Sequence, residues 1–421
     1  MSRPVVSWRT CALVCVPLFA AFAVPTLAQQ APQAPPAAPA GPTAGEKYVN
    51  IQVLKDIPAT QLHDTMLYIE AATATTCQFC HVKNDAGEWA FDKDDRTNKK
   101  TAREMIVMTR AINAQSFKGQ PEVTCQTCHQ GRRSPGSTPQ LAQMATPEQL
   151  AARAAAGPGG PGAPGGAPGQ PPAAGTAGQP PAAGAPGQPP SGGAPGQQRA
   201  RVPSETVDDV IAKLVQSAGG ADALKKLTGL VAKGTATNRM GQTSPASFEE
   251  TAKGQYRLSI DGQIPTARAY DGTAAWSLNA DKVRNLEGIE AAAVALAADM
   301  VLPLQVKDRY QGLTVRAYSR IDGKDVIAMQ GRPSPIASET LFVDRTTGQL
   351  LRRSISLITP LGRLPMQIDY SDFRAVGGVT LPYAIKMTDW ESITDLKISD
   401  VTLNPKIDPS RFAKPVPKTV Q

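Results

Sequence analysis

The chain has 421 residues, with 44 Lys and Arg against 36 Asp and Glu, which gives a net charge of +8. No basic stripe is interleaved with aromatic residues, so this modest positive charge does not indicate a nucleic-acid-binding protein. A net positive charge favours binding to acidic partner proteins or to envelope surfaces instead. Only three histidines and six cysteines occur, which limits where imidazole or thiol chemistry can take place.

The first residues have the pattern of a secretory signal peptide. Arg3 and Arg9 precede an apolar run from Cys11 to Val24, and the small-residue sequence Thr26-Leu27-Ala28 follows. The run is about 14 residues long, whereas a helix needs roughly 20 to span a bilayer. We therefore predict that residues 1–28 are a cleaved signal peptide and that the chain is exported to the periplasm or cell envelope.

The cysteines form the most specific pattern in the chain. Removal of the signal peptide takes away two of them, and the other four lie in two C-x-x-C-H units, Cys77-Gln78-Phe79-Cys80-His81 and Cys125-Gln126-Thr127-Cys128-His129. This spacing is the attachment signature of c-type haem. Two thiols add to the two vinyl groups of one porphyrin, and the adjacent His binds the iron. We predict two covalently bound haem c groups with His81 and His129 as iron ligands.

Four cysteines in an exported chain could also serve purposes other than haem attachment. Two disulfides, a redox dithiol or half of a zinc site would each use C-x-x-C. Both units are followed at once by His, every remaining Cys is used, and only His63 lies outside the motifs. This combination favours haem.

The residues alone leave two candidates open for the second axial ligand of each iron. With His63 as the only spare imidazole, both haems cannot have two His ligands, and Met is the usual alternative. Met66 lies on a predicted helix before the first motif, and Met105 and Met108 lie on a predicted helix within residues 99–113 before the second. His63 competes with Met66, and Met108 with Met105, because residues three apart share a helix face.

The chain between Asn50 and Gly131 resembles the cytochrome subunit of photosynthetic reaction centres. The resemblance rests on the segment Asn50-Ile51-Gln52-Val53-Leu54, on the Met66 helix and first motif, on residues 102–113 and on residues 123–131. In that family a Met on the helix before each motif is the sixth ligand. The resemblance therefore implies Met66 and Met105 as ligands.

The chain departs from that family in ways that affect its expected function. Family members from phototrophs carry four haems, and a His between the second helix and its motif ligates the fourth, whereas residues 113–124 contain no His here. We therefore expect a two-haem variant that transfers electrons. Its partners would be redox proteins of an envelope respiratory or photosynthetic chain.

Composition divides the chain further. Residues 29–44 are rich in Pro and Ala and are predicted to be a spacer, residues 45–140 the dihaem domain, and residues 141–202 a disordered Gly/Pro/Ala-rich linker. Residues 203–421 form the last predicted domain. The expected fold class is thus multi-domain, a mainly α haem-binding domain followed by an α+β domain.

Strand-like runs dominate the last 220 residues or so. Helices are expected at residues 206–217, 221–227 and 289–300, and roughly ten antiparallel strands at runs that include 255–260, 266–270, 314–320, 326–330, 340–344 and 349–357. Hairpin turns are expected at Asp261-Gly262, Asp271-Gly272, Asp322-Gly323 and Thr347-Gly348. The pattern predicts a curved antiparallel sheet with a few helices. Residues 341–348 and 378–383 loosely resemble half-barrel envelope proteins of the lipoprotein-carrier type, which implies a concave apolar face.

Electron transfer is the leading functional hypothesis, and no catalytic residue is assigned. A dihaem peroxidase is the first alternative, but it would need one five-coordinate haem with acid or base groups beside it. The second alternative is a carrier or sensor of a hydrophobic ligand, which would use residues 203–421. That segment contains neither Cys nor His, so haem, thiolate and imidazole chemistry are excluded from it.

Overall fold

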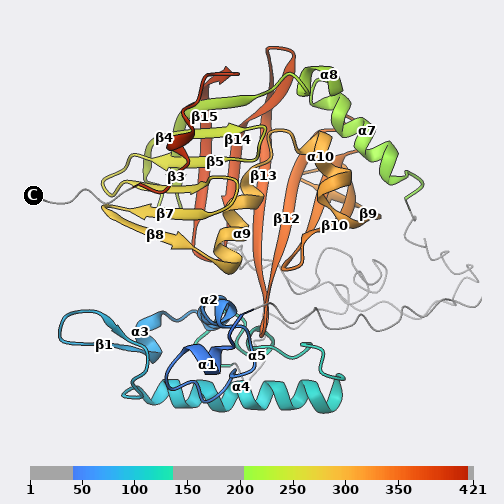
Figure 1. Ribbon diagram of the computed structural model, residues 1–421. Coiled ribbons are helices and arrows are strands. Elements are labelled where there is room, and N and C mark those ends of the chain that lie inside the picture. Colours follow the sequence, from blue (N-terminus) through green and yellow to red (C-terminus); the bar gives the residue numbers. More distant parts are fainter. Residues whose placement is uncertain (1–40, 136–202, 416–421) are drawn as a thin grey trace, which may run out of the picture. The chain divides into compact units, whose positions relative to one another are not determined.

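The computed structural model describes residues 41–135 and 203–415 (Figure 1). The predicted signal peptide, the linker at 141–202 and all but the last residues of the 29–44 spacer lie outside the described residues. Within the described ranges, no helix is both long enough and apolar enough to cross a bilayer.

Residues 41–135 are mainly helical. The two longest helices are α2, Leu62–Thr73, and α4, Thr97–Ser116, and they contain the two helices expected before the motifs. Helix α2 ends at Ala74, which adopts a left-handed conformation with φ 49°. The shorter elements are α1 (Ala44–Lys47), η1 (Ala59–Gln61), α3 (Cys77–Cys80), α5 (Cys125–His129) and a hairpin of β1 (Val82–Lys83) with β2 (Trp89–Ala90).

Residues 203–415 contain a 13-stranded antiparallel sheet and a few helices, which confirms the expected large antiparallel sheet. The helices are α7 (Val207–Ser217), α8 (Ala221–Leu224), α9 (Gly288–Ala297), α10 (Leu302–Arg309) and η3 (Pro409–Arg411). The strands are β3 (Gly229–Asn238), β4 (Thr243–Thr251), β5 (Tyr256–Ile260), β6 (Thr266–Tyr270), β7 (Ala275–Asn279), β8 (Lys282–Leu286), β9 (Gln311–Ile321), β10 (Lys324–Ser334), β11 (Ala337–Asp344), β12 (Leu350–Thr359), β13 (Gly362–Val376), β14 (Val379–Thr388) and β15 (Ile393–Leu403).

The strand order is that of two meanders joined in the middle of the sheet. Strands β3 to β8 run outward in sequence on one side and β14 to β9 on the other, and the last strand, β15, pairs with β3. Gly234 of β3 lies at this junction, where a Cβ atom would come within 2.0 Å of the Lys397 carbonyl oxygen. A larger residue would therefore force the two meanders apart.

The sheet curves around helix α9. This helix packs against β5, β6 and β7 and also against β12, although β6 and β12 are seven places apart in the strand order. In a flat sheet, seven strand spacings would span roughly 34 Å, much wider than a helix. The sheet must therefore fold over the helix, as Figure 1 shows for the strands on either side of α9. Helices α7 and α10 pack together and against β9.

Candidate functional site

Each C-x-x-C unit forms a single helical turn. Cys77–Cys80 is α3, and the His81 amide donates a hydrogen bond to the Cys77 carbonyl oxygen at 2.9 Å. Cys125–His129 is α5, where the Thr124 amide donates to the Thr127 hydroxyl at 3.0 Å. Residues three apart in a helical turn lie on one face. Both thiols of each unit are thus presented on one side, with the His at the end of the turn.

Three of the four motif thiols lie in surroundings that raise their pKa. None of them is in a disulfide. Burial, together with Glu70, raises the pKa of Cys77 to about 11, and burial raises the pKa of Cys80 and of Cys125. Redox and metal-binding cysteines have a lowered pKa, because the thiolate is the reactive form. The surroundings of Cys77, Cys80 and Cys125 therefore favour the protonated thiol.

The two motif histidines have different surroundings. The His129 Nδ1 lies 3.0 Å from the Arg132 carbonyl oxygen, a contact that leaves Nε2 free to bind a metal. The His81 Nδ1 is buried and has no hydrogen-bond partner among the described residues. Its ring packs edge-on against Phe91, with centroids 5.0 Å apart. Burial, followed by Lys99 and Arg103, lowers the pKa of His81, which favours the neutral imidazole that binds iron.

A charged cluster next to the first motif was not identified from the sequence. Lys99 is 9% exposed, and its Nζ donates to the Phe91 carbonyl oxygen at 2.8 Å and pairs with Asp94 at 2.9 Å. Arg103 binds both carboxylate oxygens of Asp94, at 2.8 and 2.9 Å. Arg103 and then Lys99 hold the pKa of Asp94 well below its usual range. The cluster fixes the loop that carries Phe91 beside His81.

The motifs pack crosswise on the two long helices. Helix α3, with the first C-x-x-C unit, packs against α4, whereas α5, with the second, packs against α2 and also contacts α4. The two helix-and-motif repeats therefore interlock. The sequence repeat indicated the two units but not this crosswise contact, because it depends on long-range packing.

The candidate sixth ligands lie on α2 and α4 and differ in how exposed they are. Met66 is half-buried on α2, whereas His63 is exposed. On α4, Ile106 and Thr109 are buried, and Met105 and Met108 are 40% and 43% exposed. Both exposed Met side chains therefore remain available on the same helix.

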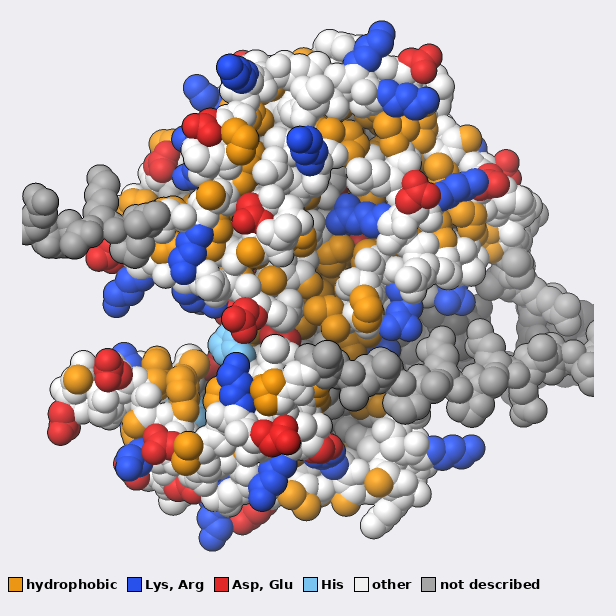
Figure 2. Space-filling view, viewed as in Figure 1, with side chains coloured by type: hydrophobic (Ala, Val, Ile, Leu, Met, Phe, Trp, Pro, Cys, Tyr) orange, Lys and Arg blue, Asp and Glu red, His pale blue; other side chains and the backbone are white. Residues whose placement is uncertain are grey.

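The residues present fit a porphyrin. Its faces need apolar side chains, its attachment needs paired thiols, and its iron needs a neutral imidazole. Besides the donors described above, several large apolar side chains in residues 41–135 are exposed: Tyr48, Val49, Phe91, Met105, Val107, Met108 and Phe117. Figure 2 shows apolar side chains among the charged ones on this part of the surface. A porphyrin would cover such side chains.

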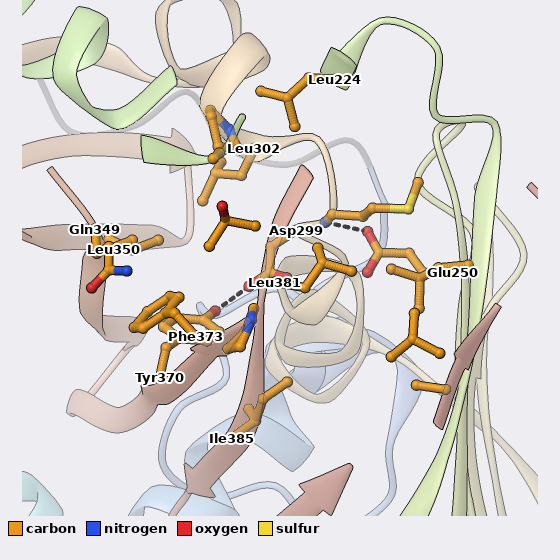
Figure 3. Close-up of a pocket in the computed structure, with 18 of the residues that line it drawn as sticks. Leu224, Glu250, Asp299, Leu302, Gln349, Leu350, Tyr370, Phe373, Leu381 and Ile385 are labelled. Atoms are coloured by element: carbon orange, nitrogen blue, oxygen red, sulfur yellow. Dashed lines mark hydrogen bonds between the residues drawn. The ribbon is translucent and has the colours of Figure 1, made fainter. Parts of the chain in front are cut away.

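A second candidate site is a cavity of about 110 Å³ within residues 203–415. Its wall is apolar over most of its area and includes Leu224, Leu302, Phe373 and Ile385, which Figure 3 shows around the cavity. Glu250 of β4 also lines it, is only 2% exposed, and accepts a hydrogen bond from the Met300 amide at 2.6 Å through Oε1. Glu250 was not identified from the sequence, because no pattern distinguishes it from its neighbour Glu249.

Comparison with known proteins bears on the first of these sites. Residues 17–156, about a third of the chain, match the family model described as the photosynthetic reaction centre cytochrome C subunit. The photosynthetic reaction center cytochrome c subunit of Thermochromatium tepidum is 36% identical over 96 residues, which is 22% of this chain and 22% of that relative. The matched region thus spans about a fifth of the relative. The resemblance of residues 50–131 to this family is confirmed.

Solved structures similar to the chain include several envelope proteins. A LolA superfamily protein from Nitrosomonas europaea has a TM-score of 0.34 at 12% identity, covering 50% of this chain and 99% of that one. A putative outer membrane lipoprotein-sorting protein domain from Vibrio parahaemolyticus has a TM-score of 0.31 at 11% identity, covering 44% and 89%. The lipoprotein-carrier type that the sequence resembles is thus among them.

Proposed function

We propose that this chain carries electrons through two covalently attached c-type haems, one on each C-x-x-C-H motif. The observation that carries the proposal is the pair of motifs, each on one helical turn with both thiols on one side and a His at its end. The match of residues 17–156 to the reaction-centre cytochrome family supports it. Bound haem would supply a reversible one-electron couple at its iron.

In this proposal the residues of the chain attach the two haems, supply their iron ligands and orient those ligands. Cys77 and Cys80 hold the first haem and Cys125 and Cys128 the second, with His81 and His129 as iron ligands. Met66 and Met105 occupy the sixth positions, following the family resemblance. The Arg132 carbonyl oxygen orients the His129 ring through Nδ1, and the cluster of Asp94, Lys99 and Arg103 fixes the loop beside His81.

The proposal includes the organisation of the chain. Residues 1–28 would direct export and residues 45–140 would carry the haems. The linker at 141–202 would tether residues 203–421 to them. Electron donors and acceptors would be redox proteins of the same envelope compartment. With both sixth positions filled, peroxide has no open iron to reach, so the proposal disfavours a peroxidase.

Covalent attachment is tested by counting haem in the full-length chain purified from an exporting host that matures c-type cytochromes. We expect two haems per chain by mass spectrometry and haem absorbance. Replacing Cys77 and Cys80 with Ala should leave one, and replacing Cys125 and Cys128 should leave the other. Two haems that survive in either double variant, or a wild-type chain without haem, would contradict the proposal.

A second function is favoured by one specific observation, the largely apolar cavity within residues 203–415. We propose that this segment binds a small hydrophobic molecule. Apolar cavities with few polar groups are typical of ligand sites. Binding of any eight-carbon amphiphile by the full chain would support this role.

A further inference from the structure

Among the described residues that line the cavity, one side chain has a buried polar atom without a hydrogen-bond partner. The Glu250 Oε2 is buried and has no hydrogen-bond partner among the described residues, while Oε1 is engaged by the Met300 amide. Figure 3 shows the Glu250 carboxyl group turned toward Asp299 and Leu381 across the cavity. A buried polar atom without a partner is unfavourable, so a ligand that satisfied it would gain that interaction.

The charges around Glu250 select against an anionic ligand. None of the described residues that line the cavity is Lys, Arg or His. The nearby guanidinium of Arg353 is already bound to Glu339 at 3.2 Å and to Asp299 at 2.9 Å. Arg309 donates to the Ala298 carbonyl oxygen at 2.9 Å. A carboxylate headgroup would therefore meet Asp299 with no free cation to compensate.

A cationic headgroup is also disfavoured. It would have to lose its hydration and ionise Glu250 within apolar surroundings, which include Phe248, Leu230 and Ile398. Burial, followed by the charge of Asp299, raises the pKa of Glu250 well above its ordinary value. Glu250 is 2% exposed, and its Oε1 already accepts the Met300 amide. The neutral carboxyl group that this burial favours can donate only from Oε2, which has no partner among the described residues and therefore suits an oxygen that accepts.

We propose that Glu250 is the specificity-determining residue of this cavity, and that it donates a hydrogen bond to the oxygen of a neutral, largely apolar ligand such as a ketone, quinone or ester. The inference rests on the proposed hydrophobic-ligand function. A cavity of about 110 Å³ compares with the roughly 150 Å³ that holds benzene in an engineered protein core. The headgroup and a few carbon atoms would be enclosed. Thr380 and Gln349 also line the cavity and are partly exposed. We expect the remaining carbon atoms of a longer ligand to extend past them.

The test compares three eight-carbon probes whose headgroups are neutral, anionic and cationic: 2-octanone, octanoate and octylammonium. Their binding to the full-length chain at pH 7 is measured by calorimetry. We expect 2-octanone to bind most tightly. Glu250→Leu should weaken its binding about tenfold, whereas Glu250→Gln, which keeps a donor, should stay within about threefold of wild type.

Glu249→Gln is the matched control, because Glu249 lies on the other face of β4 and pairs with Arg411. It should leave the binding of 2-octanone unchanged. Thermal melting shows whether each variant folds, and the near-isosteric Glu250→Gln keeps the test valid if the Leu variant does not.

The outcomes separate the inference from the function on which it rests. If 2-octanone binds Glu250→Leu as tightly as wild type, the Glu250 role is overturned while hydrophobic-ligand binding stands. Tightest binding of octanoate or octylammonium would overturn the ligand class. If no probe binds the wild-type chain, the hydrophobic-ligand function itself fails.

Discussion

At the level of single side chains, the sixth ligands decide between an electron carrier and a peroxidase. Met ligation raises a haem reduction potential and closes the iron to peroxide. We predict that Met66→Ala and Met105→Ala each lower the potential of one haem and convert it from low to high spin. Met108→Ala, on the same exposed stretch of α4, is the control and should change neither haem. A redox titration checks this, and an effect of Met108→Ala in place of Met105→Ala would reassign the ligand.

The two histidines predict unequal haem potentials. Hydrogen bonding to a ligating imidazole makes it a stronger donor, and His129 has that bond while His81 lies near Lys99 and Arg103. The haem at His81 should therefore have the higher potential. Lys99→Gln should lower it by on the order of 30–60 mV, up to a tenfold change in the one-electron equilibrium constant. Lys100→Gln, an exposed neighbour with the same charge change, should have a much smaller effect in spectroelectrochemical titration.

Glu250 should also make stability depend on pH. Its pKa is raised in the folded chain, whereas in the unfolded chain it lies near about 4.3. Above that value the folded state binds more protons than the unfolded state, so the Glu250 contribution to the free energy of unfolding falls as pH rises. Glu250→Gln cannot ionise, so its free energy of unfolding should rise relative to that of wild type by about 1.4 kcal/mol per pH unit between pH 4.3 and the raised folded-state pKa of Glu250, and should level off above that pKa. Equal urea-unfolding curves for both proteins at pH 4 and at pH 7 would disprove this.

Between elements, a buried ion-pair network links strands β11, β12 and β13. Arg353 of β12 and Glu339 of β11 are fully buried, and Asp299 joins them to Tyr370 of β13. Removing one partner from such a group strands a buried charge. We therefore predict that Arg353→Leu destabilises the chain by about 3–5 kcal/mol, and that Glu339→Leu added to it recovers part of the loss. Chemical denaturation of both variants measures this.

How much the sequence predicts also differs between elements. The Asp322-Gly323 turn was predicted from its residue pair, and its two residues have φ 47° and 79° between β9 and β10. The helices around residues 206–217 and 289–300 were predicted from apolar spacing. Helix α10 was not, because it is short and follows α9 closely. Strands β4, β13 and β14 contain Pro245, Pro365 and Pro382. Because Pro within a run of residues argues against a strand, the sequence indicated these strands less clearly than the others.

For the molecule as a whole, the sequence predicted local motifs and types of secondary structure better than the long-range contacts between them. The attachment motifs are local, so spacing alone indicates them. The pairing of β15 with β3, the crosswise packing of the motifs on α2 and α4, and the burial of Glu250 all join residues far apart in the chain. No local pattern specifies such contacts, and they determine both candidate sites.

The most direct test of the electron-transfer account is electron paramagnetic resonance of the oxidised full-length chain, with haem counted per chain. The account predicts two haems, both low-spin with the signature of His and Met ligation. A high-spin, five-coordinate haem in the wild-type protein would contradict it and would favour a dihaem peroxidase.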